Sequence, residues 1–309
     1  MVNSIKRYNN FNIKPNHKGS IVLIGNFDGL HLGHQKLFNL AKKFKKKYSL
    51  KIGVLTFEPM PKMFFNGNLS NFRISNQKQK LLLLKKFNVD FVIVKKFDKK
   101  FSKIKSTDFI KKILNKKLRA KFIFVSNNFR FGNKREGNVR QLIKYENLFN
   151  FKIVKPKPLS KNQKIISSTL IRKLLKNGEL DKVNKFLDRE WSIMGKVIKG
   201  RQLGKKIGFP TANIDIKDYI VAKPGVYAVK VKKTNTSKFI KGIANLGYRP
   251  TFNQKKILLE VHLFNFSQNL YNKYLTINFK KFIRKEKKFK NIDQLKKQIK
   301  IDLQKAKKI

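Results

Sequence analysis

The sequence predicts an α/β domain built on a parallel sheet, followed by a small antiparallel β-barrel. In the first part, apolar runs of strand length alternate with segments of helical period. Beyond about residue 190, short alternating runs follow one another between Gly, Asn and Lys turns. The length of 309 residues favours two domains, since a single core seldom grows past about 250 residues. We therefore expect domains over residues 1–188 and 189–309, with a joint at 188–191.

The first half contains a regular order of expected elements. Strands are expected at residues 21–24, 50–57, 89–94, 121–125 and 151–154, and helices at 32–44, 77–87, 107–115 and 179–187. Ligands of parallel sheets bind beyond the carboxyl ends of the strands. Three loops lie at such ends, at residues 25–34, 56–61 and 126–132, and they are the first places to look for a site.

The stretch Gly25-Asn26-Phe27-Asp28-Gly29-Leu30-His31-Leu32-Gly33-His34 joins a strand to a helix through a Gly-rich turn. Such a turn leaves backbone N–H groups free at a helix N-terminus, where phosphate is favoured. The chain has only 4 His, and two of them lie here, three residues apart on one helix face. A nucleotide site is therefore a better interpretation than a surface turn.

Two further segments of the first half have the composition of ligand contacts. Asn127, Asn128, Phe129, Arg130 and Phe131 combine amides and a guanidinium with two rings that could stack on a flat heterocycle, or could simply be core aromatics. In Ile165-Ile166-Ser167-Ser168-Thr169-Leu170-Ile171-Arg172, Ser168 or Thr169 can cap a helix, and Arg172 can face its exposed N–H groups.

The second half is expected to form barrel strands at residues 192–198, 225–231, 239–246, 257–264 and 274–282, with an amphipathic helix at 292–306 that packs against the barrel. A Pro-Thr-Ala-Asn turn at 210–213 offers neutral oxygens from Thr211 and Asn213 that suit Mg²⁺. Glu260 lies among apolar neighbours in an expected strand. It is either functional or a solvated residue facing outward.

Composition excludes several classes of protein. There is no Cys, so disulfides, thiolate nucleophiles and Cys-based zinc sites are excluded. The N-terminal residues lack the apolar core of a signal peptide, and no apolar run approaches the ~20 residues of a membrane span, so we expect a cytoplasmic protein with no membrane insertion. The net charge of +57 is spread along the chain and accompanies abundant Lys, Asn, Ile and Phe. We interpret it as codon bias and expect no specific nucleic-acid partner; protein partners are not indicated.

The string 25–34, together with 127–132 and 165–172, resembles the signatures of the adenylyltransferase half of the bacterial bifunctional riboflavin kinases/FAD synthetases. The strings 203–213 and 242–251, with Glu260 and Ile283-Arg284-Lys285-Glu286, resemble the riboflavin kinase half. The resemblance implies a Rossmann-like nucleotidylyltransferase domain, a riboflavin kinase barrel with a C-terminal helix, and ATP and Mg²⁺ as cosubstrate and metal. It implies that riboflavin is phosphorylated to FMN and that FMN is adenylylated to FAD with release of pyrophosphate.

The resemblance also implies roles for particular residues. His31 and His34 would stabilise the transferring phosphate, and Glu260 would remove the proton of the ribityl hydroxyl. Implied ATP contacts of the adenylyltransferase are Gly25, Phe27, Asp28, Gly29, Gly33, Ser167, Ser168, Thr169 and Arg172, and implied flavin contacts are Asn127, Asn128, Phe129, Arg130 and Phe131. Implied nucleotide or flavin contacts of the kinase are Gly204, Lys205, Gly208, Pro210, Asn245, Arg249 and Arg284, with Thr211 and Asn213 on Mg²⁺.

Two departures from the family pattern define the alternatives. Met60 stands where the family commonly has His, and Met can neither titrate nor donate to phosphate, so a second hypothesis is that only the kinase half is active. Lys205 replaces a usual Arg and loses its bidentate fork. A third hypothesis, from the charge, is an RNA- or polyanion-binding protein on a nucleotidylyltransferase fold.

Overall fold

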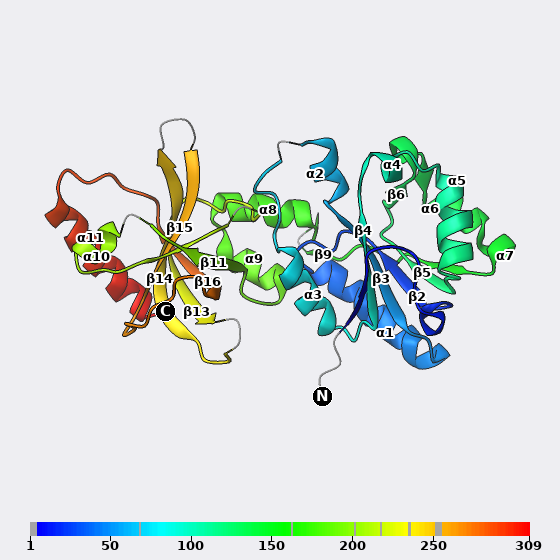
Figure 1. The fold of residues 1–309 in the computed structure, drawn as a ribbon, viewed down its shortest axis with the longest axis horizontal. Coiled ribbons are helices and arrows are strands. Elements are labelled where there is room, and N and C mark those ends of the chain that lie inside the picture. The colour runs from blue at the N-terminus through cyan, green and yellow to red at the C-terminus, as the bar shows by residue number, and fades with distance from the viewer. Residues whose placement is uncertain are drawn as a thin grey trace. The chain divides into compact units, whose positions relative to one another are not determined.

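The computed structural model describes residues 5–67, 69–161, 163–200, 202–216, 218–233, 236–250 and 255–309, without the side chains of residues 249, 250, 255 and 256. The chain forms two compact units. The first comprises the described residues up to Leu69 and Gln77–Ile166, and the second comprises Ser70–Asn76 and Ser167–Ile309. We call them the sheet unit and the barrel unit (Figure 1).

The sheet unit is built on a six-stranded parallel sheet. Its strand order is β1 (Lys6–Tyr8), β4 (Phe91–Lys96), β3 (Ile52–Glu58), β2 (Ile21–Ile24), β5 (Phe122–Phe124) and β8 (Lys152–Val154). Five of these strands were expected from their apolar runs. The edge strand β1 was not, because its three residues are mostly polar and exposed.

Helices cover the sheet on both faces, as its continuous apolar strands require. Ile21 and Leu23 of β2 share a core with α1 (Leu32–Tyr48) and α3 (Gln77–Lys85), whereas Val22 and Ile24 share a core with η2 (Phe109–Lys117) and α6 (Val139–Lys144). The helix expected at 107–115 is α5 (Ser106–Asp108) continued by η2, whose hydrogen bonds are those of a π-helix. Short elements complete the unit: η1 (Pro15–His17), α2 (Pro61–Phe65), α4 (Lys99–Ser102), β6 (Arg130–Phe131), η3 (Asn133–Arg135), β7 (Gly137–Asn138), α7 (Glu146–Phe149), β9 (Ser160–Lys161) and β10 (Lys164–Ile165).

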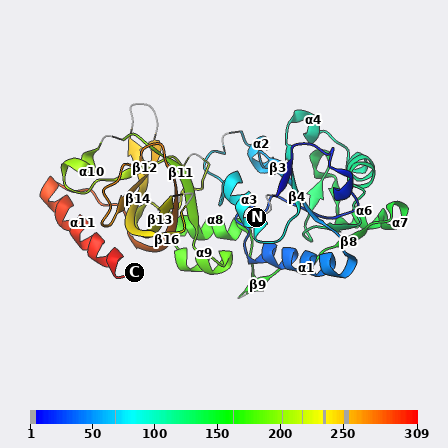
Figure 2. The same ribbon diagram turned by 60° about the horizontal axis from the view of Figure 1, so that its bottom comes forward.

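The barrel unit contains a closed antiparallel barrel. Its strand order is β11 (Ser192–Ile198), β12 (Ala212–Ile214), β15 (Lys255–Leu263), β14 (Ile240–Pro250), β13 (Gly225–Lys233) and β16 (Tyr274–Arg284), and β16 closes on β11. The Pro-Thr-Ala-Asn segment was expected to be a turn, but its end forms β12, which bridges β11 and β15. The helix α11 (Ile292–Lys307) lies along the outside of the barrel, where Leu303 and Ala306 pack on Val226 and Ile243 (Figure 2).

Trp191, the last residue of the expected joint at 188–191, has its side chain in the core of the barrel unit. Its side chain is 1% exposed and packs on Phe279, with ring centroids 4.6 Å apart and the rings tilted by 35°. Its Nε1 donates a hydrogen bond to the Ile74 carbonyl oxygen. The helices α8 (Ser168–Asn177) and α9 (Leu180–Leu187) bury Leu174, Val183 and other apolar residues in the same core. By contacts, therefore, both helices belong to the barrel unit, while the expected functional boundary at 188/189 stays a prediction. Among the described residues, no helix is both long enough and apolar enough to cross a membrane.

Candidate active sites

The turn after β2 is held in a conformation that its glycines permit. Gly29 has φ 78°, and Phe27 and Leu30 also have positive φ while their side chains are buried in the core. Gly33 lies so close to the strand end at Ile166 that an added Cβ would come 3.0 Å from the Ile166 carbonyl oxygen. The buried side chains of Phe27 and Leu30 therefore fix the turn to the core, and Gly33 lets the turn approach the segment that precedes Ser167.

The two histidines of this turn are stacked on each other. Their ring centroids are 3.7 Å apart at an angle of 24°, and Phe27 contacts His34 edge-on. Burial, followed by the neighbouring His31 and Lys80, holds the pKa of His34 well below its ordinary value. Its Nδ1 atom is buried, and no described residue forms a hydrogen bond with it. His34 is thus neutral at pH 7 and offers hydrogen-bonding atoms rather than charge.

The positive group of this region is a residue that the sequence analysis missed. Lys80 of α3 is 2% exposed, and its Nζ lies 3.4 Å from Oγ1 of Thr56 at the end of β3. Thr56 in turn donates to the carbonyl oxygen of Asn26 in the Gly-rich turn, at 3.5 Å. The sequence offered one signal for the burial of Lys80: it lies four residues before Leu84, and therefore on the same, inner face of the helix. Met60, which raised the question about this half, is buried and precedes α2.

The predicted flavin loop is divided between the core and the surface. Phe131 is buried in the sheet-unit core, and Phe129 stacks on it at 5.5 Å. Asn127, Asn128 and Arg130 are exposed at the carboxyl end of β5. The aromatic pair therefore supports the loop from the core, while the amides and the guanidinium stay available to a ligand.

The predicted ATP contacts at 167–172 lie in the barrel unit. The helix cap expected from Ser168 or Thr169 is instead Ser167, whose Oγ accepts a hydrogen bond from the Leu170 N–H at 3.2 Å. Arg172 donates from Nε to the Phe72 carbonyl oxygen and lies over the Phe72 ring at 3.7 Å. These contacts orient Arg172, and its assignment to ATP stays a prediction.

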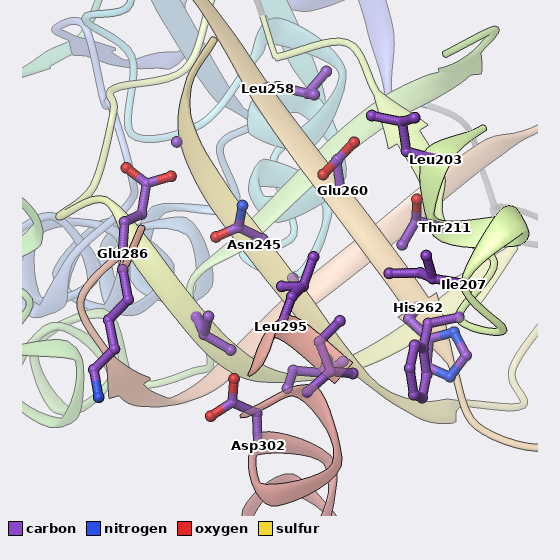
Figure 3. A pocket seen from close by; sticks show the side chains of 18 of the residues that line it. Leu203, Ile207, Thr211, Asn245, Leu258, Glu260, His262, Glu286, Leu295 and Asp302 are labelled. Atoms are coloured by element: carbon purple, nitrogen blue, oxygen red, sulfur yellow. The ribbon is translucent and has the colours of Figure 1, made fainter. Parts of the chain in front are cut away.

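The barrel unit carries a cavity of about 410 Å³ on the outer side of the barrel wall (Figure 3). Strands β14 and β15 form its floor, and α11 and the segment around α10 (Leu203–Lys206) enclose it. Leu259, Val261 and Leu263 of β15 point into the barrel core, so Leu258, Glu260 and His262 point out into the cavity. The sequence left open whether Glu260 is functional or a solvated residue that faces outward. Its side chain does face outward from the barrel, but into a covered cavity.

Three polar side chains occupy one row across the cavity wall. Asn213 of β12 and Asn245 of β14 are the direct strand partners of Glu260, one on each side. Directly opposed residues share a face of the sheet. Asn213 is 6% exposed, and its Oδ1 is buried without a hydrogen-bond partner among the described residues. The row therefore holds a carboxylate beside an unused, buried neutral oxygen.

A second carboxylate of the cavity was not predicted as a site residue. Burial raises the pKa of Glu286, against the opposing effects of a hydrogen bond from Asn245 and of Arg284. Glu286 lies against Gly247, where a Cβ would collide with its carboxylate. In the sequence, Glu286 is only the last residue of the kinase-like string at 283–286. Its contact with Gly247 depends on the fold and has no local sequence signal.

The other predicted kinase residues differ in their relation to the cavity. Gly204 lines it and cannot carry a side chain, since an added Cβ would lie 2.4 Å from the Phe209 carbonyl oxygen, whereas Lys205 lines an adjoining cavity. Gly208 has φ 90°, and the Pro210 carbonyl oxygen contacts Nδ1 of His262 at 2.8 Å. The side chain of Arg249 lies outside the described residues.

Arg284 lines the cavity but is engaged by α11. Its Nη2 lies 2.7 Å from Oδ2 of Asp302, its Nε donates to both oxygens of that carboxylate, and Nη1 donates to the Lys285 carbonyl oxygen. Asp302 also accepts from Gln298. Arg284 therefore fastens the helical wall of the cavity, and its contact with nucleotide or flavin stays a prediction.

Comparisons with known proteins connect both regions to enzyme families. Residues 13–170 match the family model described as FAD synthetase, and residues 187–309 match that of riboflavin kinase. A bifunctional riboflavin kinase/FMN adenylyltransferase from Buchnera aphidicola subsp. Acyrthosiphon pisum is 42% identical, over 94% of each chain. The protein of that name from Haemophilus influenzae is 40% identical, over 94% of each chain. The one from Escherichia coli K12 is 36% identical, over 91% of this chain and 90% of that one. The chain belongs to this family.

As a bifunctional riboflavin kinase/FMN adenylyltransferase family member, the chain is an enzyme that carries both domains. The Gly-rich turn lies within the FAD synthetase match, and the outer cavity lies within the riboflavin kinase match. A solved structure titled a macrolide-efflux protein from Streptococcus pneumoniae is similar over the whole fold, with a TM-score of 0.85 and 28% identity, over 98% of this chain and 99% of that one. An RNA- or polyanion-binding protein is not favoured by these findings.

Proposed function

We propose that the two sites act in series, with riboflavin phosphorylated to FMN in the barrel unit and FMN adenylylated to FAD at the turn of the sheet unit. The observation that supports the kinase step is the position of Glu260, a carboxylate that faces a covered cavity beside an unused buried amide oxygen. The stacked, buried histidines after β2 support the adenylyl step.

In the kinase reaction, Glu260 accepts the proton of the ribityl hydroxyl as its oxygen forms a bond to the γ-phosphorus of ATP, and ADP leaves. The residues fit a magnesium ion, because Asn213, the strand partner of Glu260, presents a buried neutral oxygen with no hydrogen-bond partner among the described residues, and Thr211 lines the cavity. Bound there, Mg²⁺ would neutralise phosphate charge. Asn245 and Arg284 stabilise the walls of the cavity. Asn245 does so by its hydrogen bond with Glu286, and Arg284 by its ion pair with Asp302.

In the adenylyl reaction, a phosphate oxygen of FMN attacks the α-phosphorus of ATP and pyrophosphate leaves. The proposed work of the protein is to position two anions and to neutralise their charge, without a covalent intermediate. His31 and His34, stacked on each other, act as hydrogen-bonding groups to the transferring phosphate. Gly25, Phe27, Asp28, Gly29 and Gly33 shape the turn that receives ATP. Ser167, Ser168, Thr169 and Arg172 are proposed ATP contacts, and Asn127, Asn128 and Arg130 are proposed flavin contacts above Phe129 and Phe131.

The deciding experiment is to incubate the full chain with riboflavin, ATP and Mg²⁺ and to separate the flavins over time. FMN that appears first and is then converted to FAD is the expected result. FMN without FAD would leave the kinase alone active, the alternative that Met60 raises. If neither FMN nor FAD forms, the proposal is contradicted.

The magnesium site has its own test. Asn213→Ala should raise the Mg²⁺ concentration for half-maximal phosphorylation about tenfold or more, since a ligand of the ion is lost. Asn278→Ala, a change of the same kind at a residue of β16 bonded to Glu190, is the matched control and should leave that concentration unchanged. An unchanged Mg²⁺ dependence in Asn213→Ala would remove this residue from the site.

The net charge is proposed to have no specific partner. Attraction of +57 to any polyanion is expected, and it should vanish with modest salt because it is a counterion effect. Sequence-selective RNA binding that persists at physiological salt would contradict this. Action in the cytoplasm is proposed as well, since a chain without Cys needs no oxidising compartment.

A further inference from the structure

Lys80 is the buried cation of the sheet unit. It comes from α3, outside every segment that carries the family resemblance, and its side chain is among the largest of those that are fully buried. Lysine is rarely buried, because removing an ammonium from water is costly. Its Nζ contacts Thr56, and Thr56 contacts the Asn26 carbonyl oxygen, so the ammonium is connected to the Gly-rich turn in two steps.

The two neighbouring histidines cannot both be charged. Their rings are stacked at 3.7 Å, and both side chains are within the protein, His31 at 5% exposure. Two imidazolium ions at that separation would repel each other strongly in a medium from which water is excluded. The charge of Lys80 is among the causes that lower the pKa of His34, after burial and the neighbouring His31.

The adenylyl reaction needs positive charge at this place. Two anionic reactants meet, and negative charge develops on the departing pyrophosphate. Met60, at the end of the same β3 strand that carries Thr56, offers none. Among the described Lys and Arg side chains of the sheet unit, Lys80 is the one that is buried, and its Nζ is linked to the turn through Thr56.

We propose that Lys80 supplies the fixed positive charge of the FMN adenylyltransferase site, acting on the reacting phosphates at the Gly-rich turn. This inference rests on the proposed adenylyl transfer. It assigns the histidines to hydrogen bonding and positioning and assigns charge neutralisation to a residue of α3. The competing explanation is structural, in which Lys80 is only a hydrogen-bond donor that fastens Thr56 and the turn.

Substitutions of Lys80 separate charge from hydrogen bonding. Lys80→Met removes both, Lys80→Gln keeps a donor without charge, and Lys80→Arg keeps the charge. For FAD formation from FMN and ATP, we expect kcat/KM to fall about 100-fold in Lys80→Met and in Lys80→Gln, and to return to within about tenfold in Lys80→Arg. Lys78→Met, at an exposed position of the same helix, is the matched control and should keep the wild-type rate.

A readout independent of activity is the titration of His34 by NMR, which is practical because the chain has only 4 His. Loss of the ammonium should raise the pKa of His34 in Lys80→Met and Lys80→Gln, and leave it low in Lys78→Met. If Lys80→Met does not fold, Lys80→Gln carries the test, since it keeps a donor to Thr56.

The outcomes separate this inference from the proposed function. Wild-type protein that makes no FAD would overturn adenylyl transfer itself. Wild-type protein that makes FAD, with Lys80→Gln at the wild-type rate, would overturn the inference and leave Lys80 a structural donor. An unshifted His34 titration in both uncharged variants would also overturn it. Riboflavin phosphorylation by the same samples, in the other unit, shows that the chain is otherwise intact.

Discussion

The two sites are built in opposite ways. The sheet-unit site begins with ten consecutive residues after one strand, holds its histidines within the protein and has a buried lysine that is linked to the turn through Thr56. The barrel-unit cavity is assembled from residues that are far apart in the chain, between Leu203 and Asp302. It lies outside the barrel wall and contains the carboxylates Glu260 and Glu286. In a chain with 74 basic and 17 acidic residues, the local chemistry of a site is therefore independent of the net charge. In the proposed reactions, one site neutralises the charge of two anions, and the other removes a proton.

The largest effect should come from Glu260→Gln. An amide cannot accept the proton of the ribityl hydroxyl, so phosphorylation of riboflavin should fall about 10²–10⁴-fold. FAD formation from added FMN should persist, which would show that the two chemistries are separate. Glu179→Gln, at a half-buried residue paired with Lys182, is the matched control in the same unit. Phosphorylation within a few-fold of wild type in Glu260→Gln would contradict the role of this carboxylate.

The converse effect is expected from His34→Ala. Loss of its hydrogen-bonding atoms at the transferring phosphate should lower FAD formation about 100-fold and leave riboflavin phosphorylation unchanged. Both rates are measured on the same sample by separating the flavins. Equal loss of both activities would point to misfolding of the chain instead of a local effect, and unchanged FAD formation would remove His34 from the reaction.

The next effect is on the stability of the barrel unit, whose cavity wall α11 is held by an ion pair. Asp302→Asn leaves the Arg284 guanidinium, 16% exposed, without its ion pair and should destabilise the barrel unit by about 3 kcal/mol. The single Trp is in the core of that unit, so its fluorescence during urea unfolding measures the change. Asp293→Asn, in the first turn of the same helix, should cost less than about 1 kcal/mol. Equal effects of the two substitutions would show that the ion pair does not fasten α11.

The smallest effect is a pH dependence of the sheet unit. The pKa of His34 is lowered in the folded state, so its unfolded form binds a proton below about pH 6.5 that the folded form resists. Stability should therefore decrease as the pH falls below that value, by at most ~1.4 kcal/mol per pH unit from this group. Amide exchange in β2 and β3 between pH 7 and pH 5 measures it, and His34→Gln should reduce the slope. A slope that is unchanged in His34→Gln would assign it to other groups, such as His17, whose pKa burial also lowers.

Much of the architecture follows from local pattern. The order of strands and helices, the two folds and the position of the Gly-rich turn were predicted because burial on two faces or on one leaves a distinct apolar period in the sequence. The edge strand β1 and the short β12 were missed, since neither has enough apolar residues to show a period. Trp191 was placed in a joint because no local pattern shows that Ile74, more than one hundred residues earlier, accepts its hydrogen bond.

The sequence by itself determined which residues have the right chemistry: two histidines in a glycine turn, a carboxylate on a strand, and neutral oxygens after a proline. Only the tertiary structure decided what surrounds them. It placed Glu260 outward but under cover, set Asn213 and Asn245 beside it, engaged Arg284 with α11, and brought Lys80 near His34. The physical reason is that spacing along the chain determines which face a side chain occupies, whereas burial and electrostatic environment depend on segments that meet only after folding.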